Sequence, residues 1–588
     1  MCGGGRPPWR ARAGDVSRAR RQRAAIFVIA LEDHNWEQPV NKFSGGIQQI
    51  YLNPAAPYIN SLVDGTATGV SDQVSYATAY YHVLATPTGA KFSIHPSEPN
   101  YLWAEAGTNF GILNDNDPFS GSPTFPNNHD TPLHLSALLT AGGHTWKSYQ
   151  EDVDLVPTGT GTPNHPATST GGLDNTALGP SQWTVPLISF SGTFSSGSSL
   201  NAYNGKNQYN YAAKHNPQVF FPDTSGGNNA TNLNPLSSNY APLQQLASDL
   251  ATNSVADYNW ITPNQFNDMH SQLTGGYAGL TGDAAMIKQG DDFLKQIVPM
   301  IMQSDAYKNH GIIIIWTDET EGAGQGDTSS QNDFQHTLAE IVISEDAHPN
   351  VTDAFGRAVP YASPVVYTHS SDLRTLQEIF GVGTAIRDAA NANDLSDLFK
   401  PGVFSHPDVR GDLPIPAGQS VTFSQGVVTG NIIVKGGTLF LSNGSHVLGK
   451  IVVASGNVSI ANSAVDGDVQ FLGGGNFAVG AGAVIHGNLL IQNLPATANL
   501  QTVCGASVGG NVEFHNSAAP AAFGAIDVVG TSVACGNAIG GDMLIHDNTA
   551  PVQLFNNAVT NNLVCQQNAS ITGSGNTASS KQDQCSVF

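Results

Sequence analysis

Apolar stretches that fit buried strands alternate with amphipathic helical patterns along residues 25–400. Strands are expected at residues 25–32, 311–319 and 338–344, and helices at residues 131–143, 291–307 and 370–383. The segment GIIIIWTDE at 311–319 contains four consecutive isoleucines and is therefore apolar on both faces. A central parallel strand has this property because helices cover both sides of its sheet. The pattern predicts an α/β unit whose mostly parallel sheet is flanked by helices.

Residues 153–235 interrupt this alternation with a loop-rich insertion of Gly, Ser, Thr, Asn and Pro. The insertion is too long for a simple connection, so we expect it to form a lid or cap over a site. Residues 401–419 are rich in Pro and Gly and are expected to be a linker.

A repeat follows the linker, within residues 420–588. A Gly-polar turn followed by a short alternating strand begins at residues 430, 449, 467, 487, 510 and 541, and NNLVC at 561 continues the series without its Gly. A repeat close to 20 residues predicts the stacked rungs of an all-β, β-helix-like solenoid. An ordinary β-sandwich with coincidental glycines is the alternative.

Charge restricts the partners of the chain. The 588 residues exceed what one core usually holds, so two or more domains are expected. Only 12% of the residues are charged. Residues 1–24 are Arg-rich and are expected to be disordered. The segment is either a tail that binds nucleic acid or a wrongly assigned start of the sequence. From residue 24 on, 45 acidic residues face 16 basic ones, a net charge of -29, which should repel nucleic acid and anionic membranes. The chain contains no run of 18 apolar residues, so no transmembrane segment is expected.

The cysteines indicate an oxidising compartment. Four of the five, Cys504, Cys535, Cys565 and Cys585, lie in the last 85 residues, and none of their spacings suggests zinc. Cys504 and Cys535 have the same offset in two matching repeat units, so stacked rungs would bring them within reach of a disulfide. We expect disulfides in this tail, Cys565–Cys585 being the second pair, and a secreted or periplasmic protein.

Two carboxylate pairs close predicted strands. Glu32 and Asp33 end the first strand, and Asp318 and Glu319 end the four-isoleucine strand. Ligands of open α/β sheets bind outside the carboxyl ends of the strands, where both pairs would converge. Four such acids repel one another unless a cation lies between them, and oxygen ligands suit Mg²⁺, Ca²⁺ or Mn²⁺. The alternative is that each pair simply begins a solvated loop.

Three further stretches contain candidate functional residues. HPSEPNYL at 95–102 places Ser97 and Asn100 on a turn stiffened by two prolines, for which a plain surface loop is the alternative. ITPNQFNDMH at 261–270 contains Asp268 and His270, and His369 directly precedes a predicted helix. A histidine at a helix start is otherwise a cap or a partly buried side chain.

Seven stretches taken together resemble a known family. LEDHNW, HPSEPNYL, LLTAGGHTWKSYQED, KHNPQVFF, ITPNQFNDMH, WTDETEG and YTHSSDLRTLQEIFG occur in the order found in the phosphoesterase family of bacterial acid phosphatases and phosphatidylcholine-type phospholipases C. That family belongs to the alkaline-phosphatase superfamily, and the resemblance covers about residues 25–400. It implies an alkaline-phosphatase-like fold and a metal-dependent phosphoric ester hydrolase.

The resemblance also implies roles for individual residues. Ser97 is the expected nucleophile, passing through a phosphoseryl intermediate, with Asn100 donating to a phosphoryl oxygen. His270, in preference to His369, is expected to protonate the leaving alkoxide. The expected ligands of one or two divalent ions (Mg, Ca, Mn or Zn) are Glu32, Asp33, Ser97, Asp268, Asp318 and Glu319. Asp33 stands where the family has Asn, which keeps an oxygen ligand but adds charge. Glu98, beside the nucleophile, is expected to face solvent.

Other functions fit the sequence less well. In the main alternative, the chain is a surface adhesin or polysaccharide-binding protein whose solenoid is the functional part; the intact Ser97 and carboxylates argue against a degenerate α/β unit. A sulfatase is excluded because no C/S-x-P-x-R motif is present. The substrate is expected to be a small phosphate ester or a phospholipid, and the tail is expected to attach to a surface, a polysaccharide or another copy of the chain.

Overall fold

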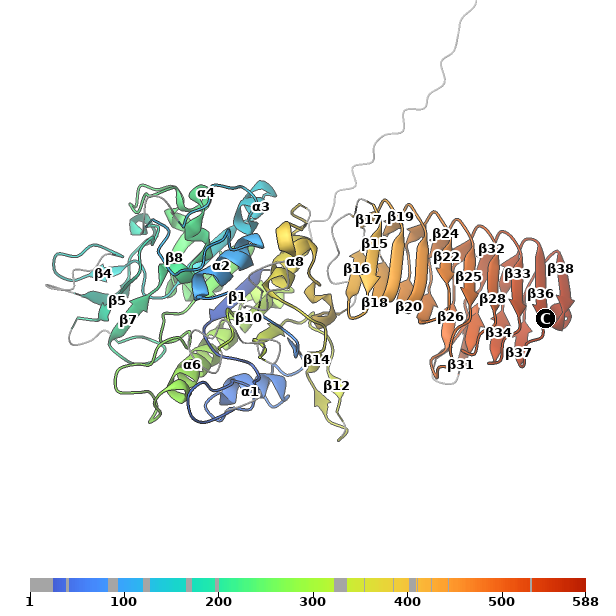
Figure 1. Cartoon of the computed structure of the whole chain (residues 1–588), viewed down its shortest axis with the longest axis horizontal. Helices are drawn as coiled ribbons and strands as arrows, with labels where there is room; N and C mark the ends of the chain where they lie inside the picture. The colour runs from blue at the N-terminus through green and yellow to red at the C-terminus, as the bar shows by residue number, and fades with distance from the viewer. Residues whose placement is uncertain are drawn as a thin grey trace, which may run out of the picture.

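The computed structural model describes residues 25–588 apart from 39–41, 83–93, 120–126, 165–171, 196–199, 322–335, 354, 384, 401–408, 410, 425, 443 and 529–530. The segment 1–24 and most of the linker therefore lie outside the described residues. An α/β unit is followed by an elongated stack of strands that ends at the C-terminus (Figure 1). No helix in the described part of the chain is both long enough and apolar enough to cross a membrane.

An eight-stranded sheet forms the centre of the α/β unit. Its order is β14 (Tyr361–Ser363), β2 (Val74–Ala77), β11 (Glu340–Ile343), β10 (Ile312–Thr317), β1 (Ile26–Leu31), β9 (Tyr258–Thr262), β3 (Trp146–Gln150) and β8 (Tyr240–Pro242). All neighbouring strands are parallel except β11, which is antiparallel to both β10 and β2. The predicted, mostly parallel sheet is confirmed, with one reversed strand.

Helices cover both faces of this sheet. Ile312 and Ile314 pack on the side of α2 (Ser97–Ala106), α3 (Leu135–Ala141) and α8 (His369–Phe380). Ile313 and Ile315 point to the other side and pack with α1 (Pro57–Val63) and α6 (Asp283–Met302). Side chains of a strand alternate between faces, so a strand that is buried on both faces needs a continuous apolar run. The expected helix at 291–307 is observed as the second half of α6, followed by a short α7 (Asp305–Lys308).

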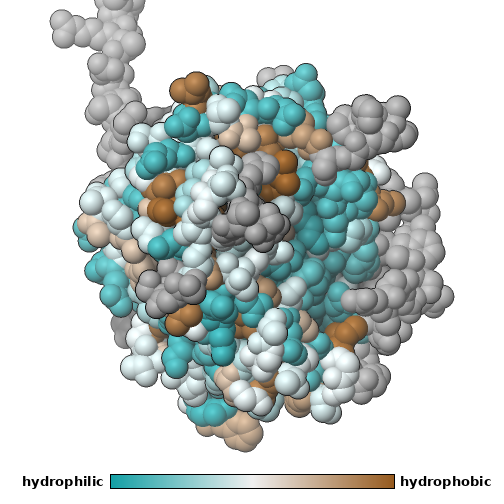
Figure 2. Space-filling view, turned by 90° about the vertical axis from the view of Figure 1, so that its left-hand side faces the viewer, coloured by the Kyte–Doolittle hydropathy of each residue, from teal (hydrophilic) through white to brown (hydrophobic). Residues whose placement is uncertain are grey.

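The insertion at 153–235 forms two small hairpins at the end of the α/β unit that is far from the solenoid (Figure 1). They are β4 (Leu155–Pro157) with β5 (Leu173–Ala177), and β6 (Phe190–Thr193) with β7 (Gln208–Tyr211). Figure 2 shows this end of the molecule: hydrophilic residues cover most of the described surface there, and apolar residues occur in small separate groups.

Parallel strands stack with the predicted repeat in residues 411–588. Ile432, Ile451, Val469, Leu489, Val512, Met543 and Leu563 occupy equivalent positions on successive rungs. Each lies two residues after a repeat start. The strands belong to a 15-stranded and a seven-stranded sheet, all of whose described pairings are parallel. The solenoid is thereby confirmed, and the β-sandwich alternative is wrong.

The glycine of each repeat has a steric cause. A Cβ on Gly449 would lie 2.3 Å from the carbonyl oxygen of Gly430 on the preceding rung. The turns stack so closely that only glycine fits without moving the backbone. Two disulfides, Cys504–Cys535 and Cys565–Cys585, join rungs in the second half of the stack, as expected from the sequence.

Candidate active site

Buried polar residues gather at the carboxyl ends of three adjacent parallel strands. Glu32 directly follows β1, Asp318 directly follows β10, and Asp268 lies in the loop after β9. The backbone N–H of Asp33 donates to Oδ1 of Asp318 at 3.2 Å, which joins the two carboxylate pairs. The predicted convergence of these pairs is confirmed.

Ser97 enters this cluster from the start of α2. Its Oγ lies 3.0 Å from Oε2 of Glu32 and 3.4 Å from Oε1 of Glu319, and the residue is 2% exposed. The turn predicted from the two prolines is in fact the first turn of a helix. Proline is tolerated there because the first backbone N–H groups of a helix have no partner within it. Ser97 therefore faces the cluster from a helix N-terminus, where the dipole favours negative charge.

Burial away from water disfavours the charged form of the carboxylates in this cluster. Burial, reinforced by neighbouring acids, raises the pKa of Glu32, Asp318 and Glu319 well above the usual range. Burial likewise raises the pKa of Asp268. A cluster of this kind either holds protons or binds a cation.

A divalent cation fits the donor atoms that the cluster presents. Oδ2 of Asp318 and Oδ2 of Asp268 are buried and make no hydrogen bond. Asp33, Asp318 and Glu319 each bring an oxygen within 4.8 Å of the others, and so do Glu32 and Asp268 together with a nitrogen of His215. These donors are mostly carboxylate oxygens, which hard cations prefer.

His215 was not singled out from the sequence. Its Nε2 lies 3.4 Å from Oε1 of Glu32 and its Nδ1 lies 3.4 Å from Oδ2 of Asp268, and the ring is buried. Burial, with the neighbouring Lys214, lowers its pKa well below the usual value, so the ring is neutral near pH 7. The only sequence signal for it was its place in KHNPQVFF, within the segment 153–235. That segment therefore contributes a residue to the cluster itself.

The histidines expected to act in catalysis lie in two different settings. His270 is partly exposed, and its Nε2 lies 3.6 Å from Oδ2 of Asp33. His369 is fully buried at the start of α8: its Nε2 contacts the backbone oxygen of Asp318 at 2.5 Å and its Nδ1 contacts Oη of Tyr80 at 2.8 Å. Burial lowers the pKa of His369 to about 3. The structure thus brings His270 to the cluster and places His369 behind Asp318.

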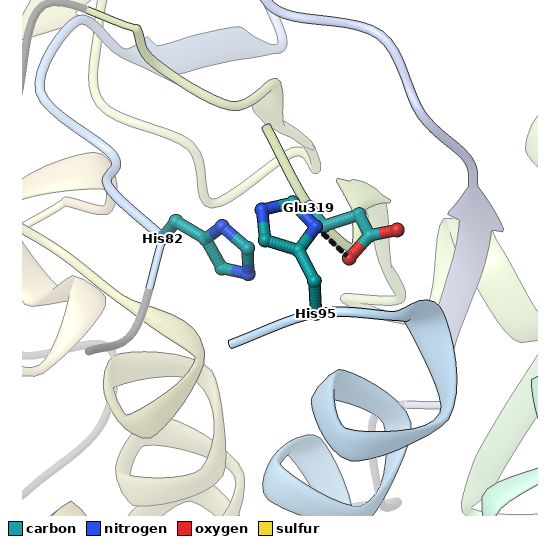
Figure 3. A group of neighbouring side chains, drawn as sticks. All are labelled: His82, His95 and Glu319. Atoms are coloured by element: carbon teal, nitrogen blue, oxygen red, sulfur yellow. Dashed lines mark ion pairs between the residues drawn. The ribbon is translucent and has the colours of Figure 1, made fainter. Parts of the chain in front are cut away.

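A second pair of histidines flanks Glu319 (Figure 3). Nδ1 of His95 lies 2.7 Å from Oε2 of Glu319, and the ring of His82 meets that of His95 edge-on at 4.9 Å. Asn100 joins this group, because its Oδ1 lies 2.9 Å from Nε2 of His82. Its Nδ2 donates to the backbone oxygen of Ile94 at 2.9 Å and lies 3.4 Å from Oε2 of Glu319. Asn100 thus orients the residues around Glu319, and nothing in HPSEPNYL indicated a partner for it at position 82.

The expectation that Glu98 faces solvent is wrong. Its side chain is fully buried, and both carboxylate oxygens accept hydrogen bonds from Nδ2 of Asn127, at 2.9 and 3.0 Å. Burial raises its pKa to about 9. The first turn of α2 packs inside the unit, so the side chain after Ser97 cannot reach water.

Comparison with known proteins matches this chain to a family of phosphoesterases. The model of the Phosphoesterase family matches residues 15–383. A probable acid phosphatase of Kluyveromyces lactis is 26% identical over 305 residues, covering 51% of this chain and 52% of that protein. An acid phosphatase of Aspergillus fumigatus is 24% identical over 302 residues, covering 51% and 49%. The chain spans about half the length of these curated relatives. A crystal structure of an alkaline phosphatase superfamily protein from Vibrio parahaemolyticus is 10% identical, with a TM-score of 0.32 over 64% of this chain and 72% of that one.

Proposed function

Because this chain belongs to the phosphoesterase family, we propose that it hydrolyses phosphoric esters, with Ser97 as the nucleophile and a divalent metal ion as cofactor. One observation supports the proposal most directly. The hydroxyl of Ser97 lies at a helix N-terminus, 3.0 Å from one carboxylate and 3.4 Å from another, in a buried cluster of acids. This arrangement offers a nucleophile, a proton acceptor and oxygen donors for a cation within one site.

The metal would be held by Asp33, Asp318, Glu319 and Glu32, with Asp268 completing the acidic cluster. When bound, a divalent ion neutralises the charge that develops on a phosphoryl group and makes a nearby hydroxyl more acidic. Mg²⁺, Ca²⁺, Mn²⁺ and Zn²⁺ are the ions to test. Glu32 accepts the hydrogen bond of Ser97 and so aims the oxygen toward the cluster.

The reaction proposed is an in-line displacement at phosphorus. Oγ of Ser97 attacks phosphorus as its proton passes to Glu32, and the ester oxygen leaves as the alcohol. Water then hydrolyses the phosphoserine, and Oγ takes the proton back. The N-terminus of α2 favours the negative charge of the phosphoryl oxygens. His270, which is partly exposed beside Asp33, would give a proton to the leaving oxygen and take one from the attacking water.

The proposal also covers the class of substrate, the compartment of the protein and the role of the solenoid. Small phosphate monoesters are the first class to test and phospholipids, as in phospholipase C, the second. Two disulfides favour export to an oxidising compartment. The solenoid, which has its own core, would attach the enzyme to a surface or a polysaccharide.

Turnover of p-nitrophenyl phosphate tests the proposal. The wild type should be active, EDTA should abolish the activity, and a divalent metal should restore it. Ser97→Ala should lose several orders of magnitude in kcat with an unchanged melting temperature. Ser61→Ala serves as the control, because it removes a hydroxyl on α1 that donates to the backbone oxygen of Tyr58.

Acid quenching during turnover followed by peptide mass spectrometry should find phosphate on Ser97. Full activity of Ser97→Ala would remove the mechanism, whereas full activity after exhaustive chelation would remove the metal.

A further inference from the structure

Two histidines stack on the outer face of the solenoid, far along the chain from the acidic cluster. His515 ends β28 (Val512–His515) and His546 ends β33 (Met543–His546), and the two residues are partners in the parallel register. Their rings are parallel within 12°, with centroids 4.8 Å apart. Glu513 lies two residues before His515 and so projects from the same face of its strand.

The three side chains bring their donor atoms to one point. Oε1 of Glu513 lies 3.4 Å from Nε2 of His546 and 3.8 Å from Nε2 of His515. All three donors lie within 4.8 Å of one another. Bonds of about 2.0–2.2 Å in tetrahedral geometry place the ligand atoms of zinc roughly 3.3–3.6 Å apart. The carboxylate and the imidazole of His546 already have that spacing, and Nε2 of His515 lies a few tenths of an ångström beyond it, measured from the carboxylate.

The Nδ1 atom of each histidine also has a partner. Nδ1 of His546 lies 2.8 Å from Oδ2 of Asp547, so in the tautomer with its proton on Nδ1 the ring donates to Asp547 and presents the lone pair of Nε2 toward Glu513. Nδ1 of His515 lies 3.1 Å from Nδ2 of Asn516; with the amide turned about its axis, Oδ1 takes that place and accepts a proton from Nδ1. Partners of this kind orient the ligand imidazoles of metal sites and raise their basicity.

We propose that Glu513, His515 and His546 form a transition-metal site on the solenoid, with Zn²⁺ as the expected ion and one coordination position open. Two imidazole nitrogens and one carboxylate oxygen suit Zn²⁺, Ni²⁺ or Cu²⁺ better than Mg²⁺ or Ca²⁺. The side chains are 14–36% exposed, so an ion can reach them from solution. The site is independent of the proposed catalysis.

A metal ion at this site would join two rungs that are 31 residues apart in the sequence. The disulfide Cys504–Cys535 spans an interval of the same length between neighbouring rungs. The ion therefore acts as a second clamp over the longest repeat of the solenoid, on a different part of the rung. Since only the folded solenoid assembles the three donors, Zn²⁺ should stabilise it by mass action.

The same domain contains a matched control in His446, Asp466 and His486. Nε2 of His446 and Nδ1 of His486 both contact Oδ1 of Asp466, at 2.9 and 3.0 Å. There the carboxylate oxygen lies between the two rings, in the place that an ion would need. This trio has the same two kinds of residue and is more exposed, at 38–60%, but it does not have the arrangement of a metal site.

The experiment is Zn²⁺ binding to the full chain, measured by equilibrium dialysis with elemental analysis. His515→Gln, His546→Gln and Glu513→Gln should each lose about one equivalent of Zn²⁺ relative to the wild type. His486→Gln should lose none, and Asp318→Asn should keep this equivalent whatever it loses at the acidic cluster. Co²⁺ in place of Zn²⁺ should give a tetrahedral visible spectrum that disappears in His546→Gln.

Thermal unfolding provides the second readout. Zn²⁺ should raise the melting temperature of the wild-type solenoid, and this rise should be absent from His515→Gln and His546→Gln. Circular dichroism without metal checks that each variant is folded, and Glu513→Gln replaces any histidine variant that is not. Wild-type Zn²⁺ stoichiometry in all three variants would overturn the proposal. An equal loss in His486→Gln, which would indicate nonspecific binding to surface histidines, would overturn it as well.

Discussion

Ser97 and Glu32 are 65 residues apart in the chain, and a hydrogen bond of 3.0 Å joins Oγ of the serine to Oε2 of the glutamate. The other oxygen of Glu32 accepts a hydrogen bond from Oη of Tyr101. Ser97 and Tyr101 are four residues apart on α2 and so lie on one face of the helix. A single helical face thus supplies both hydrogen bonds of the carboxylate that holds the proposed nucleophile.

Tyr101→Phe should therefore impair catalysis without touching the reacting atoms. The substitution leaves one oxygen of Glu32 without its donor, so the carboxylate is held less firmly against Ser97. We expect activity to fall about 10- to 100-fold and metal affinity to fall with it. Tyr307→Phe, which removes a hydroxyl bonded to Gln73 away from the site, provides the control. Comparable losses in the two variants, or none in Tyr101→Phe, would contradict the positioning role.

Asp318→Asn should weaken metal binding and stabilise the metal-free chain. Oδ2 of Asp318 is buried without a hydrogen bond, and burial and Asp33 raise its pKa, so the ionised group is costly when no cation is present. The amide has the same size and no charge. In EDTA the α/β unit of the variant should melt at the wild-type temperature or above it, whereas a saturating divalent metal should stabilise the α/β unit strongly only in the wild type. Asp292→Asn, whose carboxylate pairs with Lys288 on α6, is the control. A wild-type melting temperature that is the same with EDTA and with metal would exclude a metal in this cluster.

The comparison of sequence and structure shows which features local patterns determine. The four isoleucines from 312 to 315 predicted β10 because burial on both faces requires such a run. The solenoid rungs could be predicted because steric crowding imposes glycine at a fixed spacing. The reversal of β11 could not be predicted, since a buried strand has the same composition in either direction.

The site was predictable where residues follow strands and not where loops bring them in. Glu32 and Asp318 were found because strand ends of a parallel sheet converge. His82 and His215 come from segments without a periodic pattern, and their neighbours in space are distant in sequence. The helix that begins at Ser97 was missed because two prolines in five residues suggest a turn, although both are compatible with the start of a helix.

Asp154, in the segment 153–235, should make stability depend on pH. Burial raises its pKa to about 7, although hydrogen bonds from Thr184 and Asn164 act in the opposite direction. The pKa of Asp154 is higher in the folded chain than in the unfolded chain. Its contribution to the free energy of unfolding is therefore complete below about pH 4 and is lost as the pH rises through about 7. Asp154→Asn cannot titrate, so its unfolding free energy relative to wild type should rise by roughly 2 kcal/mol between pH 5 and pH 8. Urea titrations at both pH values measure this change; a constant difference would show that Asp154 does not titrate in this range.

Asn557 should be among the most sensitive positions of the solenoid. The residue is buried: its Nδ2 donates to the backbone oxygen of Phe523 at 3.0 Å and to Oδ1 of Asn576 at 2.9 Å, and its Oδ1 accepts from Asn537 at 2.8 Å. Asn557→Ala leaves several buried polar groups unsatisfied, at about 1–3 kcal/mol each. Asn457 makes a similar ladder contact with Asn476 on the exposed face, so Asn457→Ala should cost less than about 0.5 kcal/mol. Chemical unfolding measures both variants, and equal losses would refute the importance of the buried ladder.

A chain that ends at residue 400 should fold and keep most of its activity on a small soluble ester. The two apolar cores of the α/β unit contain no residue beyond Phe399, and the core of the solenoid contains none before Val409. All the candidate site residues lie in the first unit. A long hydrogen bond joins the two units, from Oγ of Ser396 to the backbone oxygen of Ser420 at 3.4 Å. Removing the solenoid should therefore change the melting temperature of the α/β unit little and leave kcat/KM for p-nitrophenyl phosphate within about a factor of three of the full chain, since exposed contacts contribute well under 1 kcal/mol.

A matched fragment of residues 409–588, produced under oxidising conditions, should fold on its own, because each rung is stabilised by its neighbours. A truncated chain that is folded but inactive would mean that the solenoid completes the active site, and one that does not fold would mean that the two cores depend on each other.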